Sequence, residues 1–249
     1  MFLNLRQTKH SPSHDDELDK HISVERNPRA RRLALRLDAG SGKIRLIIPG
    51  RMSIERARLF ARDHEEWIRE KLSSLPAPVP FQDGVLLPLF GKEVRLDIYT
   101  DESLKMTKCK LVGNYLQIKT NKHDPAGRIT RFIKQEAKTL FHEISRNKAA
   151  KIGKEVKSLS IRDTKSRWGS CSQDGNLSLS WRLAFAPFEA FDYVIAHEVA
   201  HLAHMDHSKS FWAVCEELSD NYKAGKSWMK QHGHGLMRYG RNSAEWHDI

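Results

Sequence analysis

The chain has 249 residues, 39% of them hydrophobic, which is enough to bury the core of one large domain or of two small ones. It carries a net charge of +11, contains no apolar run approaching the roughly 18 residues of a membrane span, and begins with a segment too soon polar for a signal peptide. Its three widely separated cysteines indicate reduced thiols, so we exclude a membrane-spanning or disulfide-stapled protein and expect a cytoplasmic one.

The N-terminal part is polar and basic. Residues 1–20 are rich in His and Asp and predict a disordered tail. Residues 32–37 and 43–48 alternate polar and apolar side chains, which predicts a hairpin with one apolar and one arginine-rich face, and the stripe at 53–73 predicts a helix. Residues 26–62 hold 11 Lys/Arg against 2 Asp/Glu. A partner such as a nucleotide or a nucleic acid would therefore meet this part, although a solvated sheet face is the commoner reason for such a pattern.

A proline-rich connector at 76–80 is the best candidate boundary in the chain. It divides the sequence into residues 21–75, the basic hairpin plus helix, and residues 81–249, which hold further strands and a histidine motif. The sequence therefore predicts two structural parts after the N-terminal tail.

The second part reads as short strands followed by helices. Alternation predicts strands within 85–120, a long helix is expected from 124 to about 152, and strands are expected at 156–162 and 176–182. A basic helix at about 226–239 completes the chain. The fold class is therefore α+β: a β-rich N-terminal part with a basic hairpin and helix, then a helical part with a short sheet over the motif helix.

The strongest motif is His197-Glu198-Val199-Ala200-His201. On a helix, histidines four residues apart share one face and can converge on one metal ion, and the adjacent glutamate can take a proton from an activated water. Pro187 suits the first turn of that helix. An incomplete copy at 142–146 has Arg146 where the second histidine should stand. The pattern indicates a metal-dependent hydrolase.

A catalytic zinc site needs a third protein ligand. On a continuing helix, His204 would stand in a row with His197 and His201, which cannot close around one tetrahedral ion. We favour His207, in a turn ahead of a helix that Ser208 would cap. His204 and Asp206 stay open as alternatives.

The motif and its surroundings resemble the YgjP-like metallopeptidase family, which is related to the SprT and WLM zinc peptidases. The resemblance covers about residues 22–240. It rests on the segment Asp192–Leu202 with His207-Ser208 and Phe211-Trp212, and on Arg167-Trp168-Gly169-Ser170-Cys171-Ser172 with Gly175-Asn176-Leu177-Ser178-Leu179. It implies a zincin-like C-terminal part that holds one Zn²⁺ per chain at His197, His201 and His207, with Glu198 as the catalytic base.

The expected function is therefore zinc-dependent hydrolysis of a peptide or related amide, with no membrane partner. A nucleoside triphosphate pyrophosphatase activity has also been associated with the family and is one alternative. A DNA-associated protease or binding module is another, since SprT-like relatives act near DNA.

Other residues are candidates for contacts with the substrate. The developing oxyanion needs a hydrogen-bond donor, and Arg167, Tyr193 and His204 are the candidates. The strand around Trp168 could pair with an extended substrate, as an exposed sheet edge can. Possible cleft residues on it are Trp168, Ser170 and Cys171.

Overall fold

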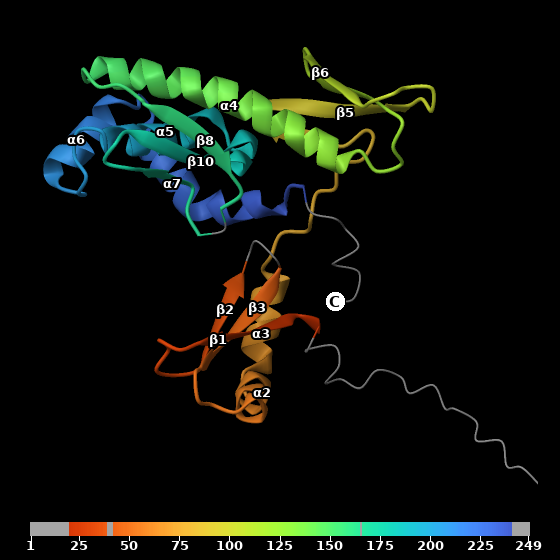
Figure 1. The fold of residues 1–249 in the computed structure, drawn as a ribbon, viewed down its shortest axis with the longest axis vertical. Coiled ribbons are helices and arrows are strands. Elements are labelled where there is room, and N and C mark those ends of the chain that lie inside the picture. Colours follow the sequence, from red (N-terminus) through yellow and green to blue (C-terminus); the bar gives the residue numbers. More distant parts are fainter. Residues whose placement is uncertain (1–19, 39–41, 165, 241–249) are drawn as a thin grey trace, which may run out of the picture. The chain divides into compact units, whose positions relative to one another are not determined.

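The computed structural model describes residues 20–38, 42–164 and 166–240 (Figure 1). It is a mixed α+β protein with three small mixed sheets, and its helices concentrate in the C-terminal half, which confirms the predicted fold class. The chain separates into two compact units between Pro76 and Ala77, at the start of the proline-rich connector. The tail predicted at 1–20 lies outside the described residues apart from Lys20.

The N-terminal unit is built on a sheet with the order β1-β3-β2. These strands are β1 (Ile22–Asn27), β2 (Ala34–Asp38) and β3 (Lys43–Pro49). β2 and β3 pair antiparallel as the predicted hairpin, although residues 39–41 of its turn lie outside the described part. β1, which pairs in parallel with β3, was not predicted, because its half-exposed side chains give little periodic signal.

The single helix predicted at 53–73 is wrong: the structure has α2 (Ile54–Arg62) and α3 (Glu65–Ser73). The break falls at His64, whose N–H bonds to the Ala61 carbonyl three residues back at 3.1 Å. Its ring Nδ1 also lies 2.8 Å from the Phe60 carbonyl oxygen, so the end of α2 is satisfied locally and the chain turns. Both helices pack their apolar faces on Ile44, Leu46 and Ile48 of β3.

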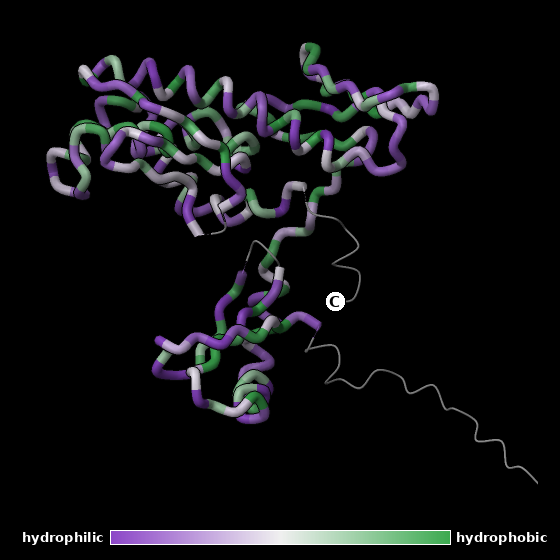
Figure 2. Tube along the Cα trace, viewed as in Figure 1, coloured by the Kyte–Doolittle hydropathy of each residue, from purple (hydrophilic) through white to green (hydrophobic). Residues whose placement is uncertain are grey.

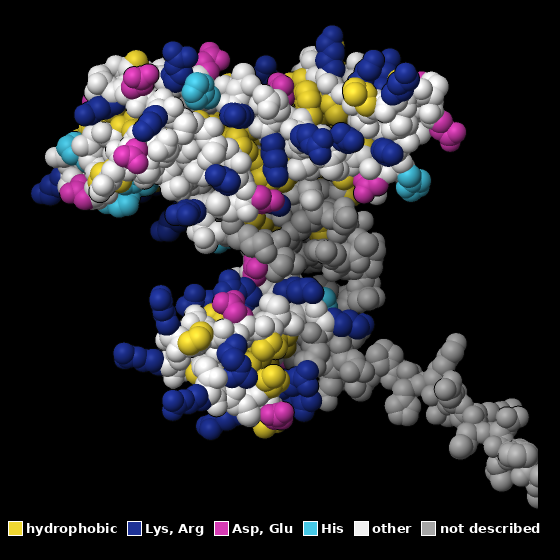
Figure 3. All heavy atoms as spheres, viewed as in Figure 1, with side chains coloured by type: hydrophobic (Ala, Val, Ile, Leu, Met, Phe, Trp, Pro, Cys, Tyr) yellow, Lys and Arg dark blue, Asp and Glu magenta, His cyan; other side chains and the backbone are white. Residues whose placement is uncertain are grey.

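The other face of this sheet carries arginines. Arg36 on β2 stands directly opposite Arg45 on β3, and Glu25 of β1 relieves their repulsion through an ion pair with Arg45 at 2.6 Å. Arg26 instead donates to backbone carbonyls after β3, including that of Gly50 at 2.7 Å. Lysine and arginine side chains crowd the visible face of this unit (Figure 3). The predicted division into an apolar and an arginine-rich face is therefore confirmed.

The C-terminal unit contains the other two sheets. One has the order β4-β5-β7-β6 and the other β8-β10-β9, so β8 and β9 form the two edges of the latter. The strands of the first sheet are β4 (Leu86–Leu89), β5 (Lys92–Thr100), β6 (Lys108–Val112) and β7 (Tyr115–Thr120). Those of the second are β8 (Ser158–Arg162), β9 (Gly169–Cys171) and β10 (Asn176–Ser180).

The long helix α4 (Ala126–Lys151) connects these sheets, since it contacts β6, β8 and α5 (Figure 1). Hydrophilic and hydrophobic positions alternate along it, as expected for a helix with one buried face (Figure 2). The Asp124 carboxylate accepts from the Ala126 N–H at 2.9 Å, and Gly153, with a φ of +64°, follows its end.

A buried ion pair fixes α4 to the motif helix. Lys148 Nζ lies 2.6 Å from Asp192 Oδ1, and both side chains are nearly inaccessible. Lys148 also donates to the Leu218 carbonyl, and the Ser219 hydroxyl donates to Asp192 Oδ2 at 2.7 Å. These contacts link α4, the motif helix and the chain at Leu218 and Ser219.

The last third of the described chain is mainly helical. It comprises η1 (Trp181–Phe185), α5 (Phe188–Ala200), α6 (Lys209–Glu217), α7 (Tyr222–His232) and η2 (Gly233–Arg238). The strand predicted at 176–182 stops at Ser180, where a 3₁₀ turn begins. The helix predicted at 226–239 is wrong in its bounds: α7 begins earlier and gives way to a 3₁₀ turn containing two glycines. In the part of the chain that the structure describes, no helix combines the length and the apolar character needed to cross a bilayer.

Candidate metal centre

The motif lies on α5, which begins after Pro187 and is enclosed by α4, α6, α7 and β9. This enclosure explains why Phe191, Ile195 and Val199 are all fully or almost fully buried. A helix covered on so many sides carries apolar residues around most of its circumference. The polar residues His197 and Glu198 therefore stand out as exceptions in an apolar setting.

The end of α5 determines which histidines can meet. His201 is the C-cap, and the N–H groups of Leu202 and Ala203 bond only three residues back. α5 therefore ends at Ala200, and the His204 N–H closes the turn on the Ala200 carbonyl at 3.0 Å. The carbonyl oxygen of His204 lies 3.0 Å from His201 Nδ1. His204 contacts the centre through its backbone, so the ring of His201 is oriented with Nε2 left available.

The turn that follows brings His207 back toward the helix. Asp206 accepts from the Ser208 N–H at 3.2 Å, and the Ser208 hydroxyl accepts from the Phe211 N–H at 3.3 Å. The N-cap predicted at Ser208 is thus confirmed. The fully exposed Asp206 shapes the turn and is not among the side chains that converge on the centre.

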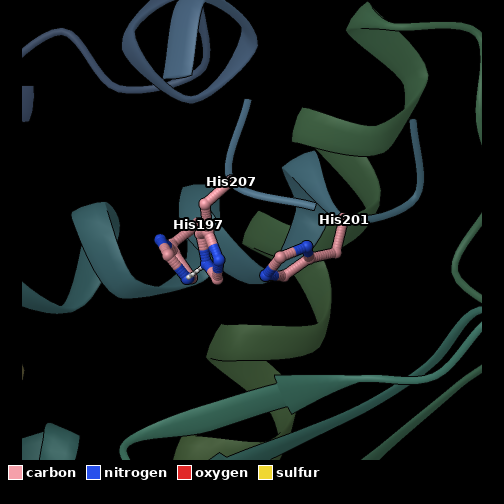
Figure 4. A group of neighbouring side chains, drawn as sticks. All are labelled: His197, His201 and His207. Atoms are coloured by element: carbon pink, nitrogen blue, oxygen red, sulfur yellow. Dashed lines mark hydrogen bonds between the residues drawn. The ribbon is translucent and has the colours of Figure 1, made fainter. Parts of the chain in front are cut away.

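His197, His201 and His207 form the one described cluster whose ligand atoms could hold a metal ion. One nitrogen from each ring lies within 4.8 Å of the others, and His197 Nε2 and His207 Nε2 are 3.2 Å apart. Figure 4 shows the rings of His197 and His207 side by side, with the ring of His201 directed toward them. Two nitrogens bound tetrahedrally to Zn²⁺ at about 2.0–2.1 Å lie roughly 3.3 Å apart, so this donor set fits zinc.

The surroundings favour the neutral form of His197 and His201, which is the form of imidazole that binds metal. Burial, with a smaller contribution from the neighbouring His201 and His207, lowers the pKa of His197 to about 4. Burial also lowers the pKa of His201. Phe211 is fully buried behind the cluster, with its ring centre 4.5–5.0 Å from those of the three histidines. Its side chain restricts the rings to this arrangement.

Glu198 lies beside the histidines and under strand β9. Its side chain is 5% exposed, and this burial raises its pKa to about 7, while the nearby Arg167 acts in the opposite direction. Gly169 of β9 makes the approach possible, because a Cβ there would stand 2.5 Å from Glu198 Oε1. The edge strand therefore passes directly over the carboxylate.

Two neighbouring cavities meet at Gly169, His197 and Glu198. The smaller, of about 320 Å³, is also lined by Ser170 and Cys171 and contains the three histidines. The larger, of about 490 Å³, is lined by Arg167, Trp168 and Tyr193. His204 lines neither. A third cavity, of about 670 Å³ between α4 and β8, holds the incomplete motif copy and no member of the histidine cluster.

Cys171, a predicted cleft residue, and Tyr193, a predicted oxyanion donor, both keep their protons at neutral pH. Burial raises the pKa of Cys171 to about 11, with Glu198 adding to the effect, so the thiol is protonated at neutral pH. Burial likewise raises the pKa of Tyr193 to about 12. Tyr193 therefore keeps its proton and can act as a hydrogen-bond donor.

Sequence reasoning missed two residues of the larger cavity, Lys226 and Lys230 on α7. They reach it because Gly225 lets α7 pack directly on the α5 backbone, where a Cβ would collide with the Glu189 carbonyl oxygen. The available signal was Gly225 within a helix, followed by two lysines four residues apart. This pattern does not show against which surface the helix packs.

Comparison with known families agrees with this geometry. The model of the YgjP-like metallopeptidase domain matches residues 31–232, so most of the chain is covered and the chain belongs to that family. No curated protein and no solved structure matches it. A peptidase domain implies a protein substrate, and the histidine triad is a site that could bind a metal ion.

Proposed function

We propose that this member of the YgjP-like metallopeptidase family is a zinc-dependent hydrolase that cuts peptide bonds with Glu198 as its general base. The observation that carries the proposal is the convergence of three imidazoles beside a buried carboxylate and an edge strand. Three histidines favour zinc over the oxygen-preferring ions Mg²⁺ and Mn²⁺.

His197 and His207 would bind the ion through the two Nε2 atoms that lie 3.2 Å apart. His201 would use Nε2, since its Nδ1 faces the His204 carbonyl. The chemistry that zinc supplies when bound is Lewis acidity, which lowers the pKa of a water molecule to about 7. We assign one ion per chain to this cluster.

Glu198 would accept the proton of the attacking water on a carboxylate oxygen and donate it to the leaving amine. A base that is 5% exposed keeps this proton from bulk solvent between the two transfers. Tyr193 and Arg167 line the same cavity as Glu198 and are the candidate donors to the developing oxyanion. His204 lines neither cavity, which argues against its ring in that role.

Strand β9 is the candidate substrate platform. It pairs with β10 on one side only among the described strands, and it lies over α5 at Gly169. An extended peptide added along its free edge would place a backbone carbonyl near the histidines. Trp168, Ser170 and Cys171 would then border the bound chain.

The test compares matched histidine variants. We expect one zinc per purified chain, lost in His207→Ala and kept in His204→Ala, because only the backbone of His204 contacts the cluster. Glu198→Gln should keep the metal and lose about 10²–10⁴-fold of peptide turnover. Unchanged zinc in His207→Ala would contradict the ligand set, and full activity of Glu198→Gln would contradict the mechanism.

A nucleoside triphosphate pyrophosphatase is the second candidate, because Lys226 and Lys230 bring positive charge beside the histidines. Phosphate groups bind such cations readily. The arginines of 26–62 belong to the other unit and would supply contacts to phosphates or to DNA if either alternative holds. Triphosphate hydrolysis that persists in His207→Ala would separate that activity from this centre.

A further inference from the structure

We propose that the cavity between α7 and Arg167 is a carboxylate-recognition subsite, so that the enzyme selects peptides carrying an acidic side chain or a free C-terminus next to the bond it cuts. This proposal rests on the peptidase function proposed above. It adds to it the chemical class of the preferred substrate.

The cavity of about 490 Å³ opens on the metal centre, because His197, Glu198 and Gly169 line both this cavity and the one that holds the histidines. A substrate that reaches the histidines along β9 therefore has a neighbouring group at the mouth of this space. The position suits a side chain or terminus one or two residues from the scissile bond.

The polar lining of the cavity is positive. Arg167, Lys226 and Lys230 face it, and Glu198 is its one acidic residue. Lys230 has no hydrogen bond or ion pair to any described residue. Lys226 donates to the Tyr222 hydroxyl at 2.8 Å and lies 4.0 Å from the centre of the Trp212 ring, and neither contact neutralises its charge. The cavity thus offers three cations to one carboxylate that is already assigned to catalysis.

The remaining lining is apolar and held in place. Met229 is buried, and Trp168 lies against Gly233 at the start of η2, where a Cβ would be 3.3 Å from the indole nitrogen. An apolar floor with a cationic rim fits a group with an aliphatic stem and a terminal carboxylate. A lysine or arginine side chain of a substrate would instead meet repulsion.

Two of the three cations, Lys226 and Lys230, come from outside the motif region. Residues 163–221 hold 4 Lys/Arg against 9 Asp/Glu, so the segment that carries the ligands is acidic overall. α7 adds Lys226 and Lys230 to this region only because it packs on α5 through Gly225. The fold therefore places a local positive site within an acidic segment, where it would attract carboxylates selectively.

Binding can be measured without turnover in the full-length Glu198→Gln protein loaded with zinc. The probes are the fluorescein-labelled peptides Ala-Ala-Ala-Glu-Ala-amide and Ala-Ala-Ala-Gln-Ala-amide, with the Gln peptide also as a free acid. We expect the Glu peptide or the free acid to bind about tenfold more tightly than the neutral amide in fluorescence anisotropy, as a charge-assisted contact would give. Comparing the Glu amide peptide with the Gln free acid shows whether the cavity binds a side-chain carboxylate or a C-terminal one.

The control lies on the same helix. Lys223→Glu makes the same charge change as Lys230→Glu at an exposed position of α7 that does not line the cavity. The preference for carboxylate should fall to about twofold or less in Lys230→Glu and persist in Lys223→Glu. Equal binding of all three peptides, equal effects of the two variants, or binding of ATP but of no peptide would overturn the proposal.

Cleavage of the same peptides by the wild-type protein, followed by mass spectrometry, tests the peptidase function separately from the carboxylate subsite. Selective binding without cleavage would keep the subsite and contradict the peptidase. Cleavage with no preference for a carboxylate would keep the peptidase and overturn the subsite.

Discussion

Replacing Gly169 by alanine tests how strand β9 and the proposed catalytic base, Glu198, fit together. The new Cβ would stand 2.5 Å from both Cγ and Oε1 of Glu198. Non-bonded heavy atoms prefer about 3.5–4.0 Å, so the carboxylate has to move by roughly 1 Å. A displacement of that size costs about 10²-fold in rate, or about 2.7 kcal/mol of transition-state stabilisation.

The assay is kcat/KM on a peptide that the wild-type protein cleaves, together with zinc content. We expect Gly169→Ala to lose activity and keep its metal, because the three atoms nearest to the new Cβ belong to Glu198 and not to the three histidines. Gly127→Ala is the matched control, since a Cβ there has no neighbour within 4 Å. Wild-type kcat/KM in Gly169→Ala would refute the placement of Glu198 beneath β9, and loss of zinc would refute the separation of base from ligands.

Three further predictions concern stability. Lys148→Ala leaves Asp192 buried without its cation and should lower the free energy of unfolding by about 3–5 kcal/mol in urea titrations. The double variant Lys148→Met with Asp192→Leu should recover much of this loss, and equal stability of the single and double variants would contradict the buried-pair argument. Gly225→Ala should lower the free energy of unfolding by roughly 1–3 kcal/mol despite the better helix propensity of alanine, because the new Cβ meets the Glu189 carbonyl. A rise in Tm would show that α7 packs differently. Zinc at 100 times its Kd should stabilise the wild-type fold by about 2.7 kcal/mol in thermal melts, and His201→Ala should abolish this stabilisation. Stabilisation by zinc that survives in His201→Ala would place the ion elsewhere.

Regular local patterns made much of the fold predictable. The hairpin of β2 and β3 and the helix α4 follow from strict two-residue and 3.6-residue periodicity, and Ser208 from the preference of helix starts for a hydroxyl. The predictions that failed had local as well as non-local causes. One apolar stripe runs through both α2 and α3, so the turn at His64 is invisible to periodicity, and β1 exists because β3 offers it a partner.

The candidate metal centre also has a part that the sequence predicts and a part that depends on the folded chain. The spacing of His197 and His201 alone places them on one helix face, because that geometry is set by the backbone of a single helix. The choice between His204 and His207 needed the turn to be folded, since both are close in sequence and only the path of the chain decides which ring returns.

The sequence by itself determined the chemistry available here: two imidazoles and a carboxylate on a helix, in a chain of the YgjP-like metallopeptidase family. Only the tertiary structure decided what surrounds them. Glycines at 169 and 225 let β9 and α7 approach α5 so closely that the buried Glu198 and two lysines distant in sequence line one cavity. Such approaches depend on the absence of a side chain between two particular backbones, and no pattern along one segment specifies the other.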